Sequence, residues 1–115
     1  MPCLKILTNL PKSEIPKDFV NKIIPVLVKT VKKDPAVFTV VVSGDCDVSF
    51  GGDSDTPGAA ATLESIGHVG AEENKIIGKE VSEFVQKELG IHPDRFFMSI
   101  YDIKGFNIVK GAITH

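Results

Sequence analysis

The sequence repeats one strand–helix–strand plan twice, and this order is the strongest constraint on its fold. A strand-like run at residues 3–7 precedes a helical pattern at 13–33 and an apolar strand at 37–42. A second strand pattern at 59–67, a helix at 71–90 and a closing strand at 94–103 follow. Two β-α-β units predict an α+β domain with pseudo-twofold symmetry, in which both helices cover one face of a four-stranded mixed sheet.

The two helical patterns each have one apolar face. Four-residue spacing relates Phe19, Ile23, Leu27 and Val31 in the first pattern, and the second carries Ile77, Val81, Phe84, Val85 and Leu89. Such stripes are typical of helices that pack on a core. We expect Ser13 to be the N-cap of the first helix and Gly90 the C-cap of the second. Pro25 should kink the first helix or remove its hydrogen bond to Asn21.

The sheet has a face that no helix of this chain would cover. Residues 37–42, "VFTVVV", are apolar nearly throughout, which is typical of a strand covered on both sides. The two predicted helices cover only one face of the sheet. Burial by neighbouring subunits is the simplest way to cover the other face, so the sequence predicts a homo-oligomer.

Composition excludes several functional classes. The 115 residues suit one domain, 1–115, and the net charge of −2 gives no general field for nucleic acid or an acidic membrane surface. Apolar runs are too short for a membrane span, and lysines interrupt the N-terminal region where a signal peptide would have its core. We therefore expect a cytoplasmic protein without nucleic-acid or membrane partners.

Metal and cofactor sites are not predicted either. The two cysteines, Cys3 and Cys46, have neither metal-ligand spacing nor a disulfide framework. The three histidines, His68, His92 and His115, do not cluster at any ligand spacing.

Pro2 stands directly before the first strand and has two interpretations. The structural one is that the first position of a strand tolerates proline, because no ladder hydrogen bond is lost there. The functional one is that removal of Met1 makes Pro2 a free secondary amine, able to act as a base or a nucleophile.

The chain path brings further groups to the same place. A six-residue strand rises about 20 Å and a helix of about sixteen residues returns about 24 Å, so Lys33 should arrive at the end of the sheet where Pro2 lies. Ile66 reaches that end if the second unit runs antiparallel to the first. A lysine after a helix also has a purely structural interpretation, in which it interacts with the helix dipole.

Motifs along essentially the whole chain resemble the macrophage migration inhibitory factor superfamily. They are "P-x-L-x-x-x-T-N-L-P", "F-G-G", "S-I-G-H-V-G", "E-N" and "H-P-D-R-F-F-x-S-I-Y-D", in this order, together with Lys33 after the first helix. The segment "N-I-V-K" at 107–110 resembles the D-dopachrome tautomerase branch.

The resemblance implies a homotrimer in which three sheets form a central barrel covered by six helices. It also implies a keto–enol tautomerase site at each subunit interface. Pro2 would be the general base after Met1 is removed, Lys33 would hold a substrate carboxylate, and Ser65 and Ile66 would form part of the pocket. Lys110 would stand at its mouth, although a solvated loop lysine is an equally good interpretation.

Departures from the family pattern affect the expected site. The tyrosine and asparagine that the adjacent subunit supplies in the family correspond to Phe97 and Ser99, so a phenol is lost. Val109 replaces a glycine before Lys110 and should narrow the mouth. No Cys-x-x-Cys segment is present, which excludes the family's thiol–disulfide activity.

Three functions follow as hypotheses. The first is a tautomerase for arylpyruvates or dopachrome-like compounds, with D-dopachrome decarboxylation as a further reaction at the same site. The second is a cytokine-like protein that binds a cell-surface receptor, which requires secretion without a signal peptide. The third is a small-molecule binding module without turnover.

Overall fold

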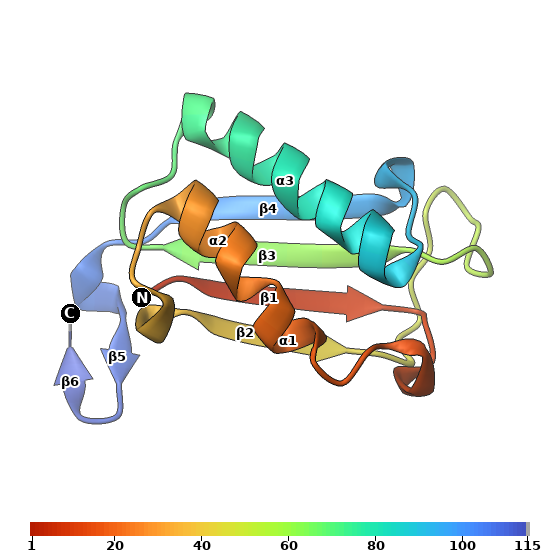
Figure 1. The fold of residues 1–115 in the computed structure, drawn as a ribbon, viewed down its shortest axis with the longest axis horizontal. Helices are drawn as coiled ribbons and strands as arrows, with labels where there is room; N and C mark the ends of the chain where they lie inside the picture. The colour runs from red at the N-terminus through yellow and green to blue at the C-terminus, as the bar shows by residue number, and fades with distance from the viewer. Residues whose placement is uncertain (115) are drawn as a thin grey trace.

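Two β-α-β units share one four-stranded sheet in the order β2-β1-β3-β4 (Figure 1). The computed structural model describes residues 1–114. The strands are β1 (Cys3–Thr8), β2 (Thr39–Ser43), β3 (Ala59–Ser65), β4 (Phe96–Asp102), β5 (Val109–Lys110) and β6 (Ile113–Thr114). The helices are α1 (Phe19–Lys22), α2 (Ile24–Val31) and α3 (Ala71–Leu89), and the short 3-10 helices are η1 (Lys12–Glu14), η2 (Pro35–Val37), η3 (Pro93–Arg95) and η4 (Gly105–Asn107).

Strand directions confirm the predicted mixed sheet. Within each unit the two strands are parallel, β1 with β2 and β3 with β4. The central pair, β1 and β3, is antiparallel, with Cys3 opposite Glu64 and Thr8 opposite Ala59. The start of β1 and the end of β3 therefore lie at the same end of the sheet.

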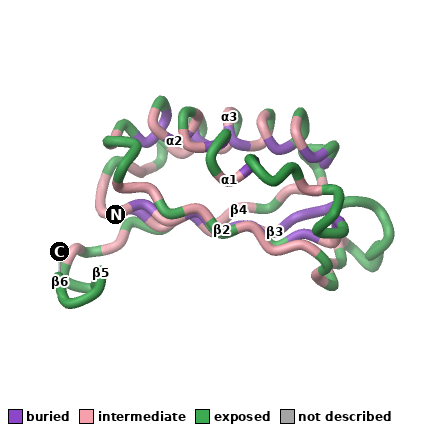
Figure 2. The backbone as a smooth tube through the Cα atoms, turned by 60° about the horizontal axis from the view of Figure 1, so that its bottom comes forward, coloured by how far each residue is buried: buried purple, intermediate pink, exposed green. Residues whose placement is uncertain are grey.

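The helices lie on one face of the sheet, as the sequence predicts, and the core fills the space between the two layers (Figure 2). Alternate residues of β1 and β3, among them Leu4, Ile6 and Leu63, are fully buried against the helices. Phe19 of α1 packs on Phe84 of α3 with ring centroids 5.6 Å apart. Each large apolar side chain buried in this way contributes about 1.5–3 kcal/mol to stability.

The first helix starts later than the sequence pattern predicts. Residues 12–14 form the single turn η1, in which Ser13 makes no capping hydrogen bond, so its assignment as the N-cap is wrong. The reason is Pro16: the residue before it, Ile15, is extended at φ −92° and ψ 121°, because a following proline disfavours helical backbone. Pro25 has the predicted effect, since the helix is divided at Ile23 and resumes as α2 with Pro25 in its first turn.

Strand β2 is also displaced from its predicted bounds, because residues 35–37 form η2 and pairing begins only at Thr39. The sheet face opposite the helices is not covered within the chain. Leu7, Val41, Phe97 and Tyr101 lie on it and expose between 45% and 59% of their surface. In the single chain this face is therefore open and rich in apolar groups.

Side chains from separate motifs hold the long loop between β2 and β3 at the far end of the sheet. Thr8 donates from Oγ1 to the carbonyl of Gly58 at 2.7 Å, and Asn9 donates from Nδ2 to the carbonyls of Ser54 and Thr56. The Arg95 guanidinium lies 4.9 Å from the ring centroid of Phe50 in the same loop. These contacts are structural, and they lie at the end of the sheet opposite Pro2.

The C-terminal hairpin of β5 and β6 projects from the body of the domain, at the end of the sheet where the N-terminus lies (Figures 1 and 2). The sequence patterns did not predict this hairpin. The apolar side chains Val109 and Ile113 of the hairpin, and Phe106 of the preceding η4, are each more than 60% exposed.

Gly44, directly after β2, allows the η1 segment to approach the sheet, and its replacement should destabilise the fold. A Cβ atom there would lie 2.9 Å from the carbonyl oxygen of Leu10 and 3.0 Å from the amide nitrogen of Lys12. Because both contacts are with backbone, Gly44→Ala is expected to lower the free energy of unfolding by about 1–3 kcal/mol in urea titrations.

Gly78→Ala is the matched control for this prediction. Gly78 lies inside α3, and nothing lies within 4 Å of the added methyl group. Alanine is the better helix former, so this variant should be more stable than the parent by about 0.5–1 kcal/mol. Equal stability of Gly44→Ala and the parent would contradict the close-approach argument.

Candidate active site

A cavity of about 210 Å³ lies beside the first residues of β1. Its walls come from β1, β2, β3 and the C-terminal hairpin, and they consist of Met1, Pro2, Cys3, Thr39, Glu64, Ile108, Val109 and Lys110. Pro2 is buried, and its carbonyl oxygen accepts a hydrogen bond from the amide of Thr39 at 3.0 Å. The N-terminal segment is thus fixed to the sheet at the wall of a cavity.

Lys33 reaches this end of the sheet from the other side. Helix α2 ends at Lys32, whose left-handed backbone, with φ 60°, turns the chain back toward the sheet. The half-buried Lys33 then donates from Nζ to the carbonyl oxygen of Ile66 at 2.7 Å. Lys33 and Ile66 therefore lie at the end of the sheet where the chain begins, although neither lines the cavity itself.

The turn after β3 is fixed by several hydrogen bonds. Ser65 donates from Oγ to the carbonyl of Gly67 at 2.7 Å, and the amide of Gly67 donates to Oδ1 of Asp102 at 2.9 Å. Nδ1 of His68 lies 2.9 Å from the carbonyl oxygen of Val31. Because a carbonyl oxygen only accepts hydrogen bonds, Nδ1 carries the proton. The turn is therefore tied to both β4 and the end of α2, which positions the Ile66 carbonyl that accepts from Lys33.

Backbone strain is concentrated near these groups. Among residues 1–114, non-glycine residues with positive φ are Lys32, Asp45 and His68. Left-handed backbone is costly for residues other than glycine and persists where the surrounding structure imposes it. Two of the three flank Lys33 and the Ile66 turn.

The cavity disfavours positive charge at the chain terminus. The pKa of the terminal amine of Met1 is lowered. The larger cause is partial burial, and the smaller is the nearby Lys33 ammonium. Burial costs the charged form its hydration, and a nearby cation repels it. A terminal amine at this end of the sheet is therefore neutral to a greater extent than it is in water at the same pH.

Cys3 has the opposite tendency. Burial raises the pKa of its thiol, Lys5 lowers it, and Glu64 raises it further, with a net upward shift. A thiol that stays protonated is a poor nucleophile, because the thiolate is the reactive form. The amine, and not the adjacent thiol, is the basic group that this environment favours.

Of the predicted site residues, Pro2 and Lys110 line the Pro2 cavity, and five do not: Lys33, Ser65, Ile66, Phe97 and Ser99. The Ser65 side chain is fully buried on the helix side, and its hydroxyl is already bonded to Gly67. Phe97 is paired with Ala60, which lies opposite Leu7, and Ser99 is paired with Thr62. With a rise of about 3.3 Å per residue, Leu7 lies roughly 17 Å along β1 from Pro2. Phe97 and Ser99 are therefore not part of the Pro2 cavity of their own chain.

Sequence analysis missed part of the cavity wall and part of its support. Glu64 and Thr39 lie on the open face beside Cys3, which strand alternation would have indicated once the register was known. Ile108 lines the cavity together with Val109 and Lys110. Asp102, which fixes the Ile66 turn, is the last residue of the motif at 92–102, but the motif does not reveal its partner, which is a backbone amide 35 residues away.

Two further findings concern metals and membranes. Among residues 1–114, no group of three or more His, Cys, Asp or Glu side chains is placed to bind a metal ion, and His115 lies outside the described residues. No helix in this part of the chain has the length and apolar character needed to cross a membrane.

Comparison with known proteins identifies the family. The sequence profile of macrophage migration inhibitory factor (MIF) matches residues 1–114. The chain is 31% identical over 108 residues to macrophage migration inhibitory factor of Rattus norvegicus, which covers 94% of this chain and 93% of that protein. The structure of the macrophage migration inhibitory factor from Trichinella spiralis matches with a TM-score of 0.93 at 23% identity, over 98% of this chain and 99% of that one. A homologue from Prochlorococcus marinus has the same fold, with a TM-score of 0.89 at 16% identity over 97% of both chains. The chain belongs to the macrophage migration inhibitory factor family.

Proposed function

We propose that this protein is a keto–enol tautomerase whose general base is the imino nitrogen of Pro2, exposed by removal of Met1. One observation carries the proposal: beside the cavity that Pro2 lines, desolvation and Lys33 lower the pKa of the Met1 amine, and removal of Met1 would leave the Pro2 nitrogen in this neighbourhood. General bases work best when their pKa is near the operating pH. A free amine in water is mostly protonated there, and this environment favours its neutral form.

The reaction is an isomerisation and needs no cofactor. The neutral nitrogen removes a proton from the carbon next to a keto group, and the C–H electrons form a C=C bond as the C=O π electrons move to oxygen. The protonated nitrogen then returns a proton to that oxygen, directly or through water, which gives the enol and restores the neutral base. Reversal returns the proton to carbon. Lys33 binds the carboxylate of an arylpyruvate, and the same ammonium repels a proton from the base. The apolar side chain of Ile66, whose carbonyl binds Lys33, strengthens both effects by excluding water around the ammonium.

The substrate class is an aromatic keto acid or a dopachrome-like compound. Lys110 lines the cavity and can bind a second anionic group or stabilise enolate charge during D-dopachrome decarboxylation. Placement in the D-dopachrome tautomerase branch is supported by residues 107–110 alone, whereas the curated relatives from Meriones unguiculatus and Rattus norvegicus are macrophage migration inhibitory factors proper. Phenylpyruvate is therefore the first substrate to assay, and D-dopachrome the second.

The proposed active unit is a homotrimer. The open sheet face displays Leu7, Val41, Phe97 and Tyr101, and burying it removes these apolar groups from water. Assembly would also bring Phe97 and Ser99 of one subunit to the Pro2 cavity of the next, completing the set of site residues. Phe97 supplies an aromatic wall there without a phenolic hydroxyl.

A second candidate function is receptor binding as a secreted, cytokine-like protein, which the family assignment favours. It places recognition on the outer surface of the trimer and needs no catalysis at Pro2. The protein would act in the cytoplasm as an enzyme and outside the cell as a signal.

Replacing Pro2 by glycine separates these functions. Pro2→Gly should lower kcat/KM for phenylpyruvate tautomerisation by about 10²–10⁴-fold, the usual contribution of a positioned base. Oligomeric state and receptor binding should be unchanged, because the open sheet face is unaltered. Enol formation is followed by absorbance.

Retention of Met1 is a second test of the same base. A variant whose N-terminus is blocked by an additional residue, verified by intact mass, should be as inactive as Pro2→Gly. Full activity of either variant would refute the assignment of Pro2 as the base.

Lys33→Gln removes a charge and keeps a donor for the Ile66 carbonyl. Because the Lys33 ammonium lowers the pKa of the terminal amine, its removal should raise that pKa toward the ordinary value, without reaching it, since burial remains. The acid limb of the kcat/KM profile should move to higher pH, and KM for phenylpyruvate should rise because the carboxylate loses its partner. Lys32→Gln, at the exposed neighbouring position, should change neither quantity. A pH profile that is the same in both variants would exclude Lys33 as the group that tunes the base.

Val41→Glu tests the trimer. A carboxylate on the open sheet face should prevent its burial, so sedimentation equilibrium should find monomers, and activity should fall with the loss of the shared site. Ile76→Glu is the control, because Ile76 is 59% exposed on α3, away from that face. It should remain trimeric; a trimeric Val41→Glu would show that assembly uses another surface.

A further inference from the structure

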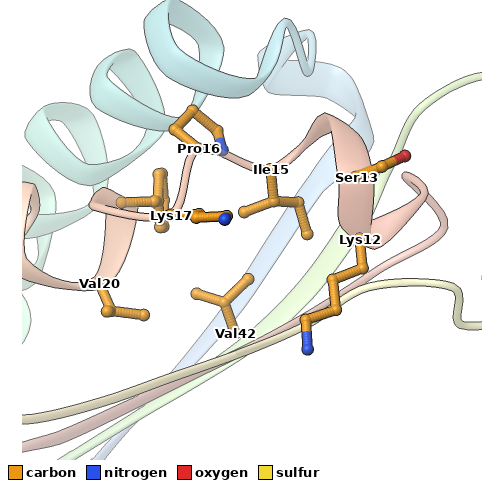
Figure 3. Close-up of a pocket in the computed structure, with 8 residues that line it drawn as sticks. Lys12, Ser13, Ile15, Pro16, Lys17, Val20 and Val42 are labelled. Carbon is orange, nitrogen blue, oxygen red and sulfur yellow. The ribbon is translucent and has the colours of Figure 1, made fainter.

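A second and larger cavity, about 510 Å³ in volume, lies between the η1–α1 segment and strand β2 (Figure 3). Its lining consists of Lys12, Ser13, Ile15, Pro16, Lys17, Phe19, Val20 and Val42. Val42 is near the end of β2, whereas the Pro2 cavity is at its start. The proposed tautomerase chemistry uses none of these residues.

The local sequence explains why the helical layer leaves a gap here. Pro16 keeps residue 15 extended, so the regular helix begins only at Phe19 and α1 is four residues long. The end of β2 is consequently covered by a loop in place of a helix. At one side of the gap the loop approaches the sheet closely, because Gly44 has no side chain. A Cβ atom on Gly44 would lie 3.0 Å from the side chain of Ile15.

The interior of this cavity is apolar. Figure 3 shows Ile15, Val20 and Val42 directed toward a common space under the η1–α1 segment. Phe19 belongs to the core, being 1% exposed, and Val42 packs against the core. An apolar ligand portion would therefore sit against the hydrophobic core of the domain.

Two cations stand at the edge of this space. Lys12 comes from η1 and Lys17 from the segment that precedes α1, and neither ammonium forms an ion pair within residues 1–114. Asp45 lies beside η1, where its Oδ2 accepts a hydrogen bond from the backbone amide of Lys12 at 3.2 Å. Glu14 and Asp18 of the same segment are exposed and do not line the cavity.

We propose that this cavity binds an amphipathic carboxylate, with its apolar body against Ile15, Val20 and Val42 and its anionic group between Lys12 and Lys17. Cavities of about 300–1,000 Å³ with an apolar lining and a few polar groups are typical small-molecule sites. The observed volume of about 510 Å³ falls in this range and suits a medium-chain fatty acid. Charge complementarity selects the carboxylate over a neutral molecule of equal size.

Decanoate and 1-decanol form a matched pair of probes, because they share the chain and differ in charge. Each is titrated into the full-length protein with labelled Ile and Val methyl groups and followed by NMR. Decanoate should give saturable shifts at Ile15, Val20 and Val42, with little change at Ile113 near the Pro2 cavity. Decanol should shift the same methyl groups at a higher concentration.

The lysine double variant K12Q/K17Q tests the role of charge. Exposed lysine–carboxylate contacts each contribute a several-fold factor at most, so affinity for decanoate should fall by about tenfold. Affinity for decanol should change less than twofold. K87Q is the control, since Lys87 is exposed on α3 and lies outside the cavity; it should leave both affinities unchanged.

Three results would overturn the proposal. The first is decanoate shifts confined to the Pro2 cavity or the open sheet face, and the second is equal affinity for decanoate and decanol. The third is the absence of shifts in the parent protein up to the solubility limit of decanoate, as would follow if a second copy of the chain filled the cavity.

The test is independent of the tautomerase proposal, because phenylpyruvate turnover is measured separately. Failure to bind decanoate leaves the tautomerase proposal intact, and an inactive protein that binds decanoate as described supports only this site.

Discussion

The antiparallel pairing of β1 with β3 is the constraint on which the rest of the structure depends. It places the first residue of one unit and the last strand residue of the other at the same end of the sheet. The parallel return of β2 through α2 then brings Lys33 to that end, within 2.7 Å of the Ile66 carbonyl. With parallel central strands, Pro2 and Ile66 would lie at opposite ends of the sheet, and Lys33 would lose the Ile66 carbonyl as its hydrogen-bond acceptor.

Most motif residues that mark the family have structural work at the two ends of this sheet. Thr8, Asn9 and Arg95 hold the loop between β2 and β3 through its backbone carbonyls. Ser65 and Asp102 hold the turn beside Lys33. These motif residues therefore fix the geometry around the candidate site and do not themselves react. Polar residues occur at these positions because buried backbone amides and carbonyls need hydrogen-bond partners.

Sequence reasoning succeeded where a periodic pattern was long and failed where a local exception decided the outcome. Helix α3 follows its predicted stripe from Ala71 to Leu89 and ends at Gly90 with φ 69°. Ser13 was misassigned because the apolar stripe was extended through Pro16, which stops helical backbone one residue earlier. The same error concealed the cavity under the η1–α1 segment, since a continuous helix would have covered the end of β2.

The sequence by itself determined the two β-α-β units, the apolar faces of their helices and the presence of a basic residue after α2, because these follow from periodicity and from residue order. Only the tertiary structure decided the register that places Cys3 opposite Glu64, the hydrogen bond that the amide of Gly67 donates to Asp102, and the separation of Phe97 from Pro2 within one chain. These depend on contacts between residues far apart in the chain, often through backbone groups that every residue shares. A sequence pattern cannot specify such a partner, because any residue at that position offers the same amide and carbonyl.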